Sequence, residues 1–248
     1  MAKMLGIDIG GTGIKGAIVD TNEGLLLSDR IKYATPKNAT PKNVIETALK
    51  IVKDLDWEGK PIGAGCPAIV KQGITKSATN IDKSWIDFPV EKTFSNMAGA
   101  PVTLLNDADA AGLAELSFGE AKDVPGVCIL ITLGTGIGSA TFIDGILVPN
   151  TELGMLKMGK GIAEDYASNR VRDKYDMKWE DWGANLNDYL NHLELLFSPT
   201  KIVISGGVSK KFSKYEKYLN TEAQVVPAKL RNNAGIIGAA LGMQERLK

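Results

Sequence analysis

Histidine and cysteine are scarce in this chain of 248 residues, which contains one histidine, His192, and two cysteines, Cys66 and Cys128. The cysteines lie far apart and form no Cys-x-x-Cys pair, so the sequence supplies neither a cysteine–histidine zinc site nor a disulfide framework. We therefore expect no zinc. Unless His192 serves, a general base working near pH 7 is expected to be a carboxylate, with Lys, Tyr or Cys as weaker alternatives. His192 lies between apolar positions of an expected helix and receives no role.

An excess of either charge and a long apolar run are also missing. The 29 basic residues balance the 29 acidic ones, so there is no broad positive field to attract nucleic acid. No apolar run approaches membrane-spanning length. The chain enters an expected strand at Met4 and reaches Gly10 without the apolar stretch of a signal peptide. We expect a cytoplasmic protein with neither a nucleic-acid nor a membrane partner.

Glycine, in contrast, is abundant, and one glycine-rich turn occurs twice. The segment Ile7–Ala17, with Gly10, Gly11 and Gly13, is echoed about half a chain later by Ile131–Ala140, with Gly134, Gly136 and Gly138. Each turn lies between two apolar, β-rich runs and predicts the tip of a strand-turn-strand hairpin. Glycine allows the tight bend and leaves backbone N–H groups free to meet an anion. The repeat indicates a duplicated domain, and two such tips facing each other would hold a phosphate chain from both sides.

The order of apolar segments predicts an α/β protein of two related domains, 1–105 and 106–248, with the last helix as a candidate for packing back on the first. The expected strands are Met4–Ile9, Gly16–Asp20, Leu25–Tyr33, Pro61–Pro67, Val102–Leu105, Val127–Leu133, Ser139–Ile143 and Lys201–Ser205. The expected helices are Val44–Leu55, Ala108–Phe118, Ala163–Tyr175, Leu186–Phe197, Lys211–Leu219 and Ala234–Gly242.

Two common nucleotide motifs are excluded. Gly11–Gly16 matches Gly-x-Gly-x-x-Gly, but a dinucleotide fingerprint requires a helix directly after it, and Ala17-Ile18-Val19 is typical of a strand. The chain contains no Gly-x-x-x-x-Gly-Lys-Ser/Thr, so it has no P-loop. A single glycine hairpin is as consistent with a plain tight turn as with phosphate binding, and the second copy favours phosphate binding.

Four carboxylates stand where chemistry is expected. Asp107 follows a strand and opens a helix, where the helix dipole favours its ionised form, although a helix-capping role is the simpler alternative and Asp109 is a rival for either. Glu152 is a loop carboxylate or a ligand, and Glu164 is a first-turn acid or a ligand. A third glycine turn, Ser205–Ser209, follows a strand and suits a phosphate or nucleotide groove.

Together these motifs resemble the ROK family of sugar kinases, and the resemblance spans the chain. It rests on Asp8–Thr12, Asn106–Ala111, Leu133–Gly138 and Gly206–Ser209. It implies the duplicated ribonuclease-H-like fold of actin and hexokinase, with a central cleft. The segments Thr79–Trp85 and Pro149–Gly154 are most similar to the polyphosphate glucokinase branch, which lacks the cysteine-rich zinc segment of other members.

The resemblance also implies roles for the residues. Asp107 would be the base that takes the sugar hydroxyl proton, and Asp8 would orient Mg²⁺ through water. The side chains that would hold the sugar are Asn80, Asn106, Glu152 and Glu164. The residues that would hold phosphate are Gly10, Gly11, Thr12, Lys15, Gly134, Thr135, Gly136, Gly206 and Gly207.

The chain departs from the family at Met155, where a sugar-contacting histidine is usual three residues after the glutamate of Glu-Leu-Gly. A thioether donates no hydrogen bond.

We expect a cytoplasmic, homodimeric kinase. It would move a phosphoryl group from polyphosphate or ATP, with Mg²⁺, to a hexose, and the expected acceptor is the 6-hydroxyl of glucose. The alternatives are a kinase for mannose or an amino sugar, and a non-catalytic sugar-binding protein of the same fold.

The expected donor follows from a lysine pattern after the third glycine turn. Lys210, Lys211, Lys214 and Lys217 recur at three- and four-residue spacing, which places them along one side of an α-helix. A polyanion leaving the turn would meet them in succession, although a solvated lysine face explains the pattern equally well. Similarity to the polyphosphate branch favours polyphosphate used at least as well as ATP.

Overall fold

The computed structural model describes residues 3–78 and 81–248 and divides the chain into two compact units. The first unit comprises residues 1–114 with 233–248, and the second comprises residues 115–232. The sequence placed the boundary after residue 105. It lies after Ala114 instead, because the first two turns of helix α3 (Asp107–Phe118) pack within the first unit. The last helix, α7 (Ala234–Arg246), also belongs to the first unit.

The first unit is built on a mixed sheet in the order β3-β2-β1-β5-β8, with β4 pairing to β2. Strands β1 and β2 form an antiparallel hairpin, and β1, β5 and β8 are parallel neighbours. The strands of this sheet are β1 (Lys3–Ile9), β2 (Gly13–Asp20), β3 (Leu25–Leu26), β4 (Ile31–Ala34), β5 (Ile62–Cys66) and β8 (Val102–Asn106). A two-stranded ribbon of β6 (Val70–Lys71) and β7 (Ile74–Thr75) follows β5.

The second unit repeats this topology in the order β11-β10-β9-β14-β15. Again a central hairpin, β9 with β10, is followed by parallel neighbours, β14 and β15. The strands are β9 (Val127–Leu133), β10 (Ile137–Ile143), β11 (Ile146–Val148), β14 (Lys201–Ser205) and β15 (Gln224–Pro227). A small ribbon of β12 (Lys157–Met158) and β13 (Gly161–Ile162) lies apart from this sheet. The matching strand orders confirm the duplication inferred from the glycine hairpins.

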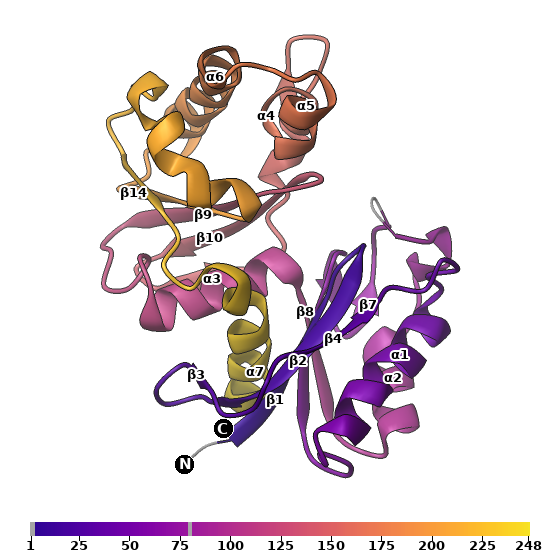
Figure 1. The fold of residues 1–248 in the computed structure, drawn as a ribbon. Coiled ribbons are helices and arrows are strands. Elements are labelled where there is room, and N and C mark those ends of the chain that lie inside the picture. The colour runs from indigo at the N-terminus through magenta and orange to yellow at the C-terminus, as the bar shows by residue number, and fades with distance from the viewer. Residues whose placement is uncertain (1–2, 79–80) are drawn as a thin grey trace. The chain divides into compact units, whose positions relative to one another are not determined.

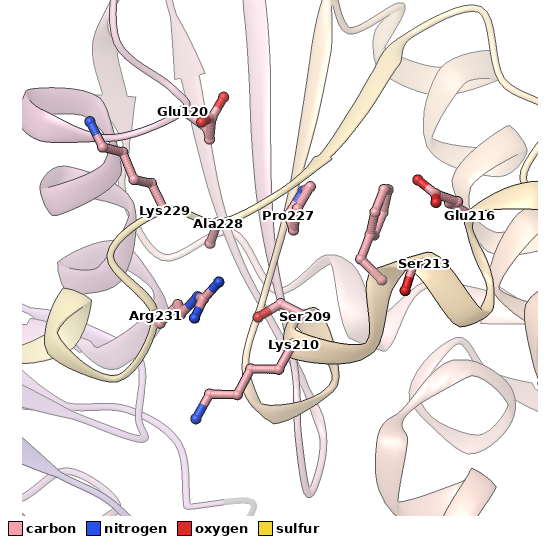
Figure 2. A pocket seen from close by; sticks show the side chains of 10 residues that line it. Glu120, Ser209, Lys210, Ser213, Glu216, Pro227, Ala228, Lys229 and Arg231 are labelled. Carbon is pink, nitrogen blue, oxygen red and sulfur yellow. The ribbon is translucent and has the colours of Figure 1, made fainter.

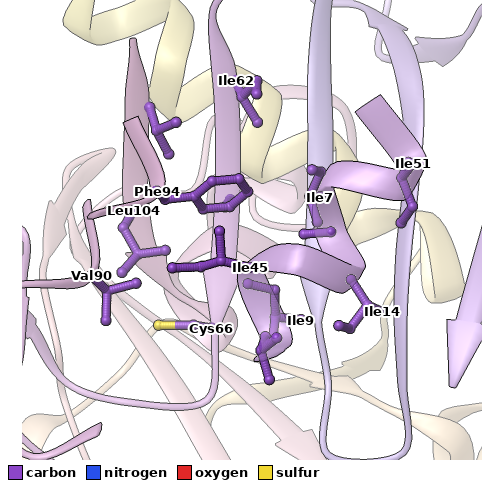
Figure 3. Packing of buried hydrophobic residues seen from close by; sticks show 14 of the residues in the cluster. Ile7, Ile9, Ile14, Ile45, Ile51, Ile62, Cys66, Val90, Phe94 and Leu104 are labelled. Atoms are coloured by element: carbon purple, nitrogen blue, oxygen red, sulfur yellow. The ribbon is translucent and has the colours of Figure 1, made fainter. Parts of the chain in front are cut away.

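Two helices cover one face of the first sheet and enclose its core (Figure 1). They are α1 (Pro41–Asp54) and α2 (Val90–Ala98). Alternate residues of β1, including Ile7 and Ile9, point toward Ile45 of α1 and Phe94 of α2 (Figure 3). All four side chains are fully buried, and each such burial contributes about 1.5–3 kcal/mol to stability.

The opposite face of this sheet is built for close approach of α7. A Cβ atom on Gly6 would lie 1.9 Å from the carbonyl oxygen of Ile236, and one on Gly63 would lie 1.8 Å from that of Ala239. Both glycines therefore let the helix backbone rest directly on the strands. Gly238 of α7 has the same function against Ala110 of α3, which explains why a helix tolerates this glycine.

The core of the second unit lies under a longer helix, α6 (Trp179–Phe197). Its buried face contributes Trp182, Leu186, Tyr189, Leu190 and Leu193. Shorter helices complete the unit: α4 (Glu164–Ala167), α5 (Asn169–Lys174), and the 3-10 helices η2 (Leu153–Met155), η3 (Gly207–Lys214) and η4 (Glu216–Tyr218). The first unit has a further 3-10 turn, η1 (Lys83–Trp85), and the 3-10 turn η5 (Arg231–Asn233) lies where the chain passes from the second unit to the first.

Three sequence predictions are wrong in detail. The helix expected at Ala163–Tyr175 is two short helices, α4 and α5, separated by extended backbone at Ser168. The expected strand Leu25–Tyr33 is two short strands, β3 and β4, separated by a break at residues 27–30. The expected α-helix Lys211–Leu219 is instead η3 and η4, with non-helical backbone angles at Lys211. Across the described residues, no helix combines the length and the apolar character needed to cross a membrane.

Candidate active site

Two carboxylates of the first unit lie at the same edge of its sheet. Asp8 on β1 is level with Gly65 on β5, and Gly65 is level with Leu105 on β8. Asp107 follows two residues later, as the first residue of α3. Because the carboxyl ends of parallel strands meet at one edge, this edge is where an α/β sheet of this kind binds ligands.

The first glycine turn projects from the same edge. Gly11 and Thr12 at its tip are exposed, and the Gly10 N–H donates to the Gly13 carbonyl at 3.1 Å. Thr35 on the neighbouring loop steadies the turn, because its hydroxyl donates to the Gly10 carbonyl at 2.6 Å. The structure therefore keeps a compact, exposed backbone turn of the kind that binds anions.

Lys15 lies beside this turn and pairs with Asp8. Its Nζ is 3.2 Å from Asp8 Oδ2, and both side chains are partly exposed. The ion pair keeps a cation next to the glycine turn and orients the carboxylate. Gly235 of α7 leaves the space that Asp8 needs, since a Cβ there would lie 3.1 Å from Asp8 Cγ.

Asn106, rather than Asp107, caps helix α3. The Asn106 Oδ1 accepts hydrogen bonds from the N–H groups of Ala108 at 2.9 Å and Asp109 at 3.2 Å. Its Nδ2 donates to the Ala68 carbonyl at 3.3 Å. The capping alternative for Asp107 is therefore wrong, and the amide expected to hold sugar also fixes the start of α3.

The same contacts separate Asp107 from its rival Asp109. Asp107 is partly exposed, whereas Asp109 is 2% exposed. Asp107 also lies close to Cys66, whose thiol pKa is raised by burial and further by the Asp107 carboxylate. Of the two, Asp107 is the carboxylate that a substrate can reach, and the helix N-terminus favours its ionised form.

Glu164, the first residue of α4, joins the second glycine turn to that helix. Glu164 is buried, and its Oε2 accepts the Ile137 N–H at 3.0 Å. A Cβ on Gly136 would lie 2.2 Å from that oxygen, so glycine is needed at this position. The Arg170 Nη2 lies 3.7 Å from the Glu164 Oε1, and the Arg170 N–H donates to the Gly134 carbonyl at 3.0 Å.

Glu152 faces the same region of the second unit. Burial raises the pKa of its carboxyl group, and the nearby Glu164 carboxylate raises it further. Ser139 of β10 positions this segment, because its Oγ accepts the Leu153 N–H at 2.9 Å and donates to the Thr151 carbonyl. Glu152 thus lies between two residues tied to the hairpin that carries the glycine turn.

Two residues expected at the sugar remain, Met155 and Asn80. Met155 ends η2 and is 48% exposed, so its thioether is accessible beside Glu152. Asn80 lies outside the described residues.

The third glycine turn meets the second one directly. Gly206 has φ +87°, and a Cβ there would lie 2.4 Å from the Leu133 carbonyl oxygen, at the residue before Gly134. Gly207 has open space around its Cα and is exposed. The Gly206 carbonyl accepts the Ser209 hydroxyl at 2.8 Å and so closes the first turn of η3.

A groove of about 430 Å³ lies next to this turn in the second unit (Figure 2). Lys210 of η3 extends along it, and Lys229 and Arg231 line it from the chain after β15. Two acids, Glu120 and Glu216, also line the groove. A fully buried residue, Glu115, holds the chain after β15 by accepting the N–H groups of Lys229 at 3.2 Å and Leu230 at 2.6 Å.

Three residues that position the turns were not expected from the sequence, namely Thr35, Ser139 and Arg170. Thr35, Ser139 and the Arg170 N–H each form a hydrogen bond to a segment distant in the chain. The only feature of the sequence that could have pointed to Ser139 and Thr35 is that each is a polar residue beside a glycine-rich or strand segment.

The comparisons with known proteins identify the family of this chain. The ROK family model matches residues 4–156, and the chain belongs to that family. It is 44% identical to the polyphosphate glucokinase of Mycobacterium tuberculosis, over 95% of this chain and 89% of that protein.

Solved structures give the same picture. The structure is similar to the inorganic polyphosphate/ATP-glucomannokinase of Arthrobacter sp. strain KM, with a TM-score of 0.95, 43% identity and coverage of 99% of this chain and all of the other. It is also similar to a ROK family glucokinase of Streptomyces griseus in complex with glucose and AMPPNP, with a TM-score of 0.83, 25% identity and coverage of 98% and 99%.

Proposed function

We propose that this chain transfers a phosphoryl group from polyphosphate or ATP to the 6-hydroxyl of glucose. The observation that carries the proposal is the similarity over almost the whole chain to polyphosphate glucokinase, combined with a reachable Asp107 at the ligand-binding edge of the sheet. Phosphoryl transfer needs alignment and charge neutralisation more than covalent chemistry, and the glycine turns and lysines supply both.

Asp107 acts as the general base in this account. It accepts the proton of the attacking sugar hydroxyl while the oxygen–phosphorus bond forms. A carboxylate suffices, because in a loose transition state the proton leaves late. The cap that Asn106 provides keeps Asp107 in the first turn of α3, where the helix dipole stabilises the carboxylate.

Glu152, Glu164 and Asn106 bind the sugar hydroxyls in this proposal, and Asn80 is assigned to the same task. Burial raises the pKa of Glu152, and Glu164 is held in place by the Ile137 N–H. Both carboxylates are thus partly shielded from water, as expected of groups that bind sugar hydroxyls. Met155 contributes an apolar contact in place of the usual histidine, which makes the identity of the hexose the least constrained part of the proposal. Mannose and amino sugars are the alternative acceptors, and a sugar-binding protein without turnover is the alternative function.

The donor phosphates bind to the three glycine turns, at Gly10–Thr12, Gly134–Gly136 and Gly206–Gly207, with Lys15 nearby. The exposure of Gly11, Thr12, Thr135 and Gly207 at the tips supports this assignment. The cationic groove of Lys210, Lys229 and Arg231 extends from the third turn and suits the outer part of an anionic donor.

Asp8 is the residue that would hold Mg²⁺, through water. No group of three or more His, Cys, Asp or Glu side chains that could enclose a metal occurs in residues 3–78 and 81–248, so a fully protein-ligated cation does not fit there. One partly exposed carboxylate at a phosphate-binding turn does fit Mg²⁺, which keeps its waters and is carried largely by substrate phosphates. When bound, Mg²⁺ would neutralise charge on the donor phosphates.

We place the protein in the cytoplasm and assign it a homodimeric state, both on the family resemblance. Sedimentation of the purified protein at micromolar concentration tests the second assignment, with twice the chain mass expected.

A grid of sugars against donors tests the proposal as a whole. Glucose, mannose and glucosamine are each incubated with Mg²⁺ and either ATP or polyphosphate, and the phosphorylated sugar is measured. Glucose with either donor is expected to give the highest kcat/KM. If the protein binds a sugar but forms no product with any combination of sugar and donor, the non-catalytic alternative is supported.

A further inference from the structure

Three cationic side chains converge on one tryptophan of the second unit. The guanidinium carbon of Arg172 lies 3.7 Å from the centroid of the Trp179 ring, and the Nζ atoms of Lys211 and Lys214 lie 5.8 and 5.9 Å from it. Tyr215 stacks on the same indole, with ring centroids 5.8 Å apart. We call Arg172, Trp179, Lys211 and Lys214 the Trp179 cluster.

In the part of the chain that the structure describes, only one of the three positive charges of this cluster is paired with an acid. Over the described residues, neither Lys211 nor Lys214 has a carboxylate within 4 Å. Arg172 contacts Asp173 at 2.9 Å, but its Nε is buried and has no hydrogen-bond partner among the same residues. The segment Gly207–Tyr218 contains four lysines and a single acid, whereas the whole chain is neutral.

Like charges held this close repel each other, and cation–π contacts offset the repulsion only partly, by about 0.5–1 kcal/mol each at an exposed site. An anion bound beside the two lysines would reduce the repulsion and accept hydrogen bonds from their ammonium groups. The aromatic contacts also hold the two lysines in place before a ligand arrives, which reduces the entropy lost on binding.

Both segments that supply these cations touch the second glycine turn. Arg172 follows Arg170, whose N–H donates to the Gly134 carbonyl. Lys211 and Lys214 belong to η3, which begins next to Gly206, the residue that rests on Leu133. An elongated anion bound at the turn therefore has fixed cations within a few residues on two sides.

We propose that the Trp179 cluster is a docking site for the outer phosphates of a polyphosphate chain whose terminal phosphates occupy the glycine turns. The inference rests on the proposed function and adds a second contact region for that donor. ATP has three phosphates and ends in an uncharged nucleoside, so it gains nothing from the cluster. The lysines act as a pair around Trp179, not as the linear stripe along an α-helix that their spacing predicted.

The test compares two double variants that remove the same charge. Lys211→Gln with Lys214→Gln removes the lysines of the cluster. Lys50→Gln with Lys60→Gln is the matched control, because these lysines also lie over aromatic rings, Tyr33 at 5.7 Å and Trp57 at 4.9 Å, but belong to the first unit.

KM is measured for long-chain polyphosphate, tripolyphosphate and ATP. The cluster variant is expected to raise KM for the long chain about three- to tenfold at low salt, with smaller changes as salt increases. The KM values for tripolyphosphate and ATP are expected to stay within about twofold of the parent, and the control variant is expected to match the parent with all three donors.

Binding without turnover separates this inference from the proposed function. Long-chain polyphosphate is titrated into the protein without sugar, and tryptophan emission is recorded. The docking site is supported if polyphosphate changes the emission of the parent and of the control variant but not that of the cluster variant. This holds even if the parent turns over only ATP. In that case the proposed use of polyphosphate as a donor is wrong, but the docking site is not. No emission change in the parent, or equal effects of the two double variants on long-chain KM, would overturn the docking site.

Discussion

At the scale of single residues, turnover depends most directly on Asp107. Asp107→Asn keeps the shape of the side chain and removes the base, so kcat is expected to fall by about 10²–10⁴-fold while glucose affinity changes little. Steady-state rates with ATP and equilibrium binding of glucose measure the two quantities separately. A kcat within about threefold of the parent would exclude Asp107 as the base.

Met155 offers a test of sugar recognition at the residue where the chain departs from its family. Met155→His introduces a donor at a half-exposed position, where burial adds little cost. A new hydrogen bond to a sugar hydroxyl contributes about 0.5–1.5 kcal/mol, so KM for glucose is expected to fall severalfold. Met155→Leu, which adds no donor, is the control and should leave KM unchanged. Weaker glucose use by the histidine variant would show that the pocket is shaped for methionine and for another sugar.

Glu152 links sugar binding to pH. Burial and the Glu164 charge disfavour its ionised form, so its pKa lies above the ordinary 4.5, and it gains a proton at a higher pH than an exposed glutamate does. A protonated carboxyl group is a poorer acceptor, so KM for glucose is expected to rise as pH falls through this raised pKa. Glu164→Gln removes the repulsive charge and should move the midpoint of this rise to lower pH. A midpoint that stays in place or moves upward would contradict the assigned coupling.

At the scale of elements, the junction of β9 and η3 depends on one glycine. Gly206→Ala must adopt φ near +87° and places a Cβ 2.4 Å from the Leu133 carbonyl, so we expect a loss of about 1–3 kcal/mol in the free energy of unfolding. Gly207→Ala is the control, because nothing lies within 4 Å of its added Cβ. Denaturant unfolding measures both. Equal stabilities of the two variants would show that the junction yields to the methyl group without cost.

The elements that the sequence predicted well are those with local signals. Both glycine hairpins and β14 (Lys201–Ser205) follow from residue type and from apolar runs bounded by turns. Helix α2 went unpredicted because it is only nine residues long: its apolar positions Val90, Phe94, Met97 and Ala98 have helical spacing, but they cover barely two turns. The helix expected at Lys211–Leu219 is wrong because residues three apart align in both α- and 3-10 helices, and spacing alone does not separate the two.

In the candidate site, too, the predictable residues are those with a local signal in the sequence. Asp107 and the glycine turns were predictable, because each combines a special residue type with a place at a strand end. The cap that Asn106 provides is local, and the sequence left it open because Asp107 is an equally good capping residue type. The support from Ser139, Thr35 and the Arg170 N–H was not predictable, because each of these contacts joins segments brought together only by folding. The Trp179 cluster belongs to this second group, since Arg172 and Lys211 lie far apart in the chain.

At the scale of the whole molecule, the two units share one sheet topology and each carries its hairpin turn at the corresponding position. Asp107 and Asp8 belong to the first unit, whereas Glu152 and Glu164 belong to the second. The proposed reaction therefore requires groups from both halves of the duplication. We expect a fragment of residues 115–232 alone to show no sugar phosphorylation, even where it folds and binds polyphosphate.

The most direct test of the central claim is to identify the product made by the full chain. Glucose labelled with ¹³C is incubated with the protein, Mg²⁺ and polyphosphate, and then with ATP, and the product is examined by ¹³C and ³¹P nuclear magnetic resonance. The account predicts phosphorus bonded to the oxygen on carbon 6 with both donors, and no product from the Asp107→Asn variant over the same period. Phosphorylation at another carbon, or no product with either donor, would contradict it.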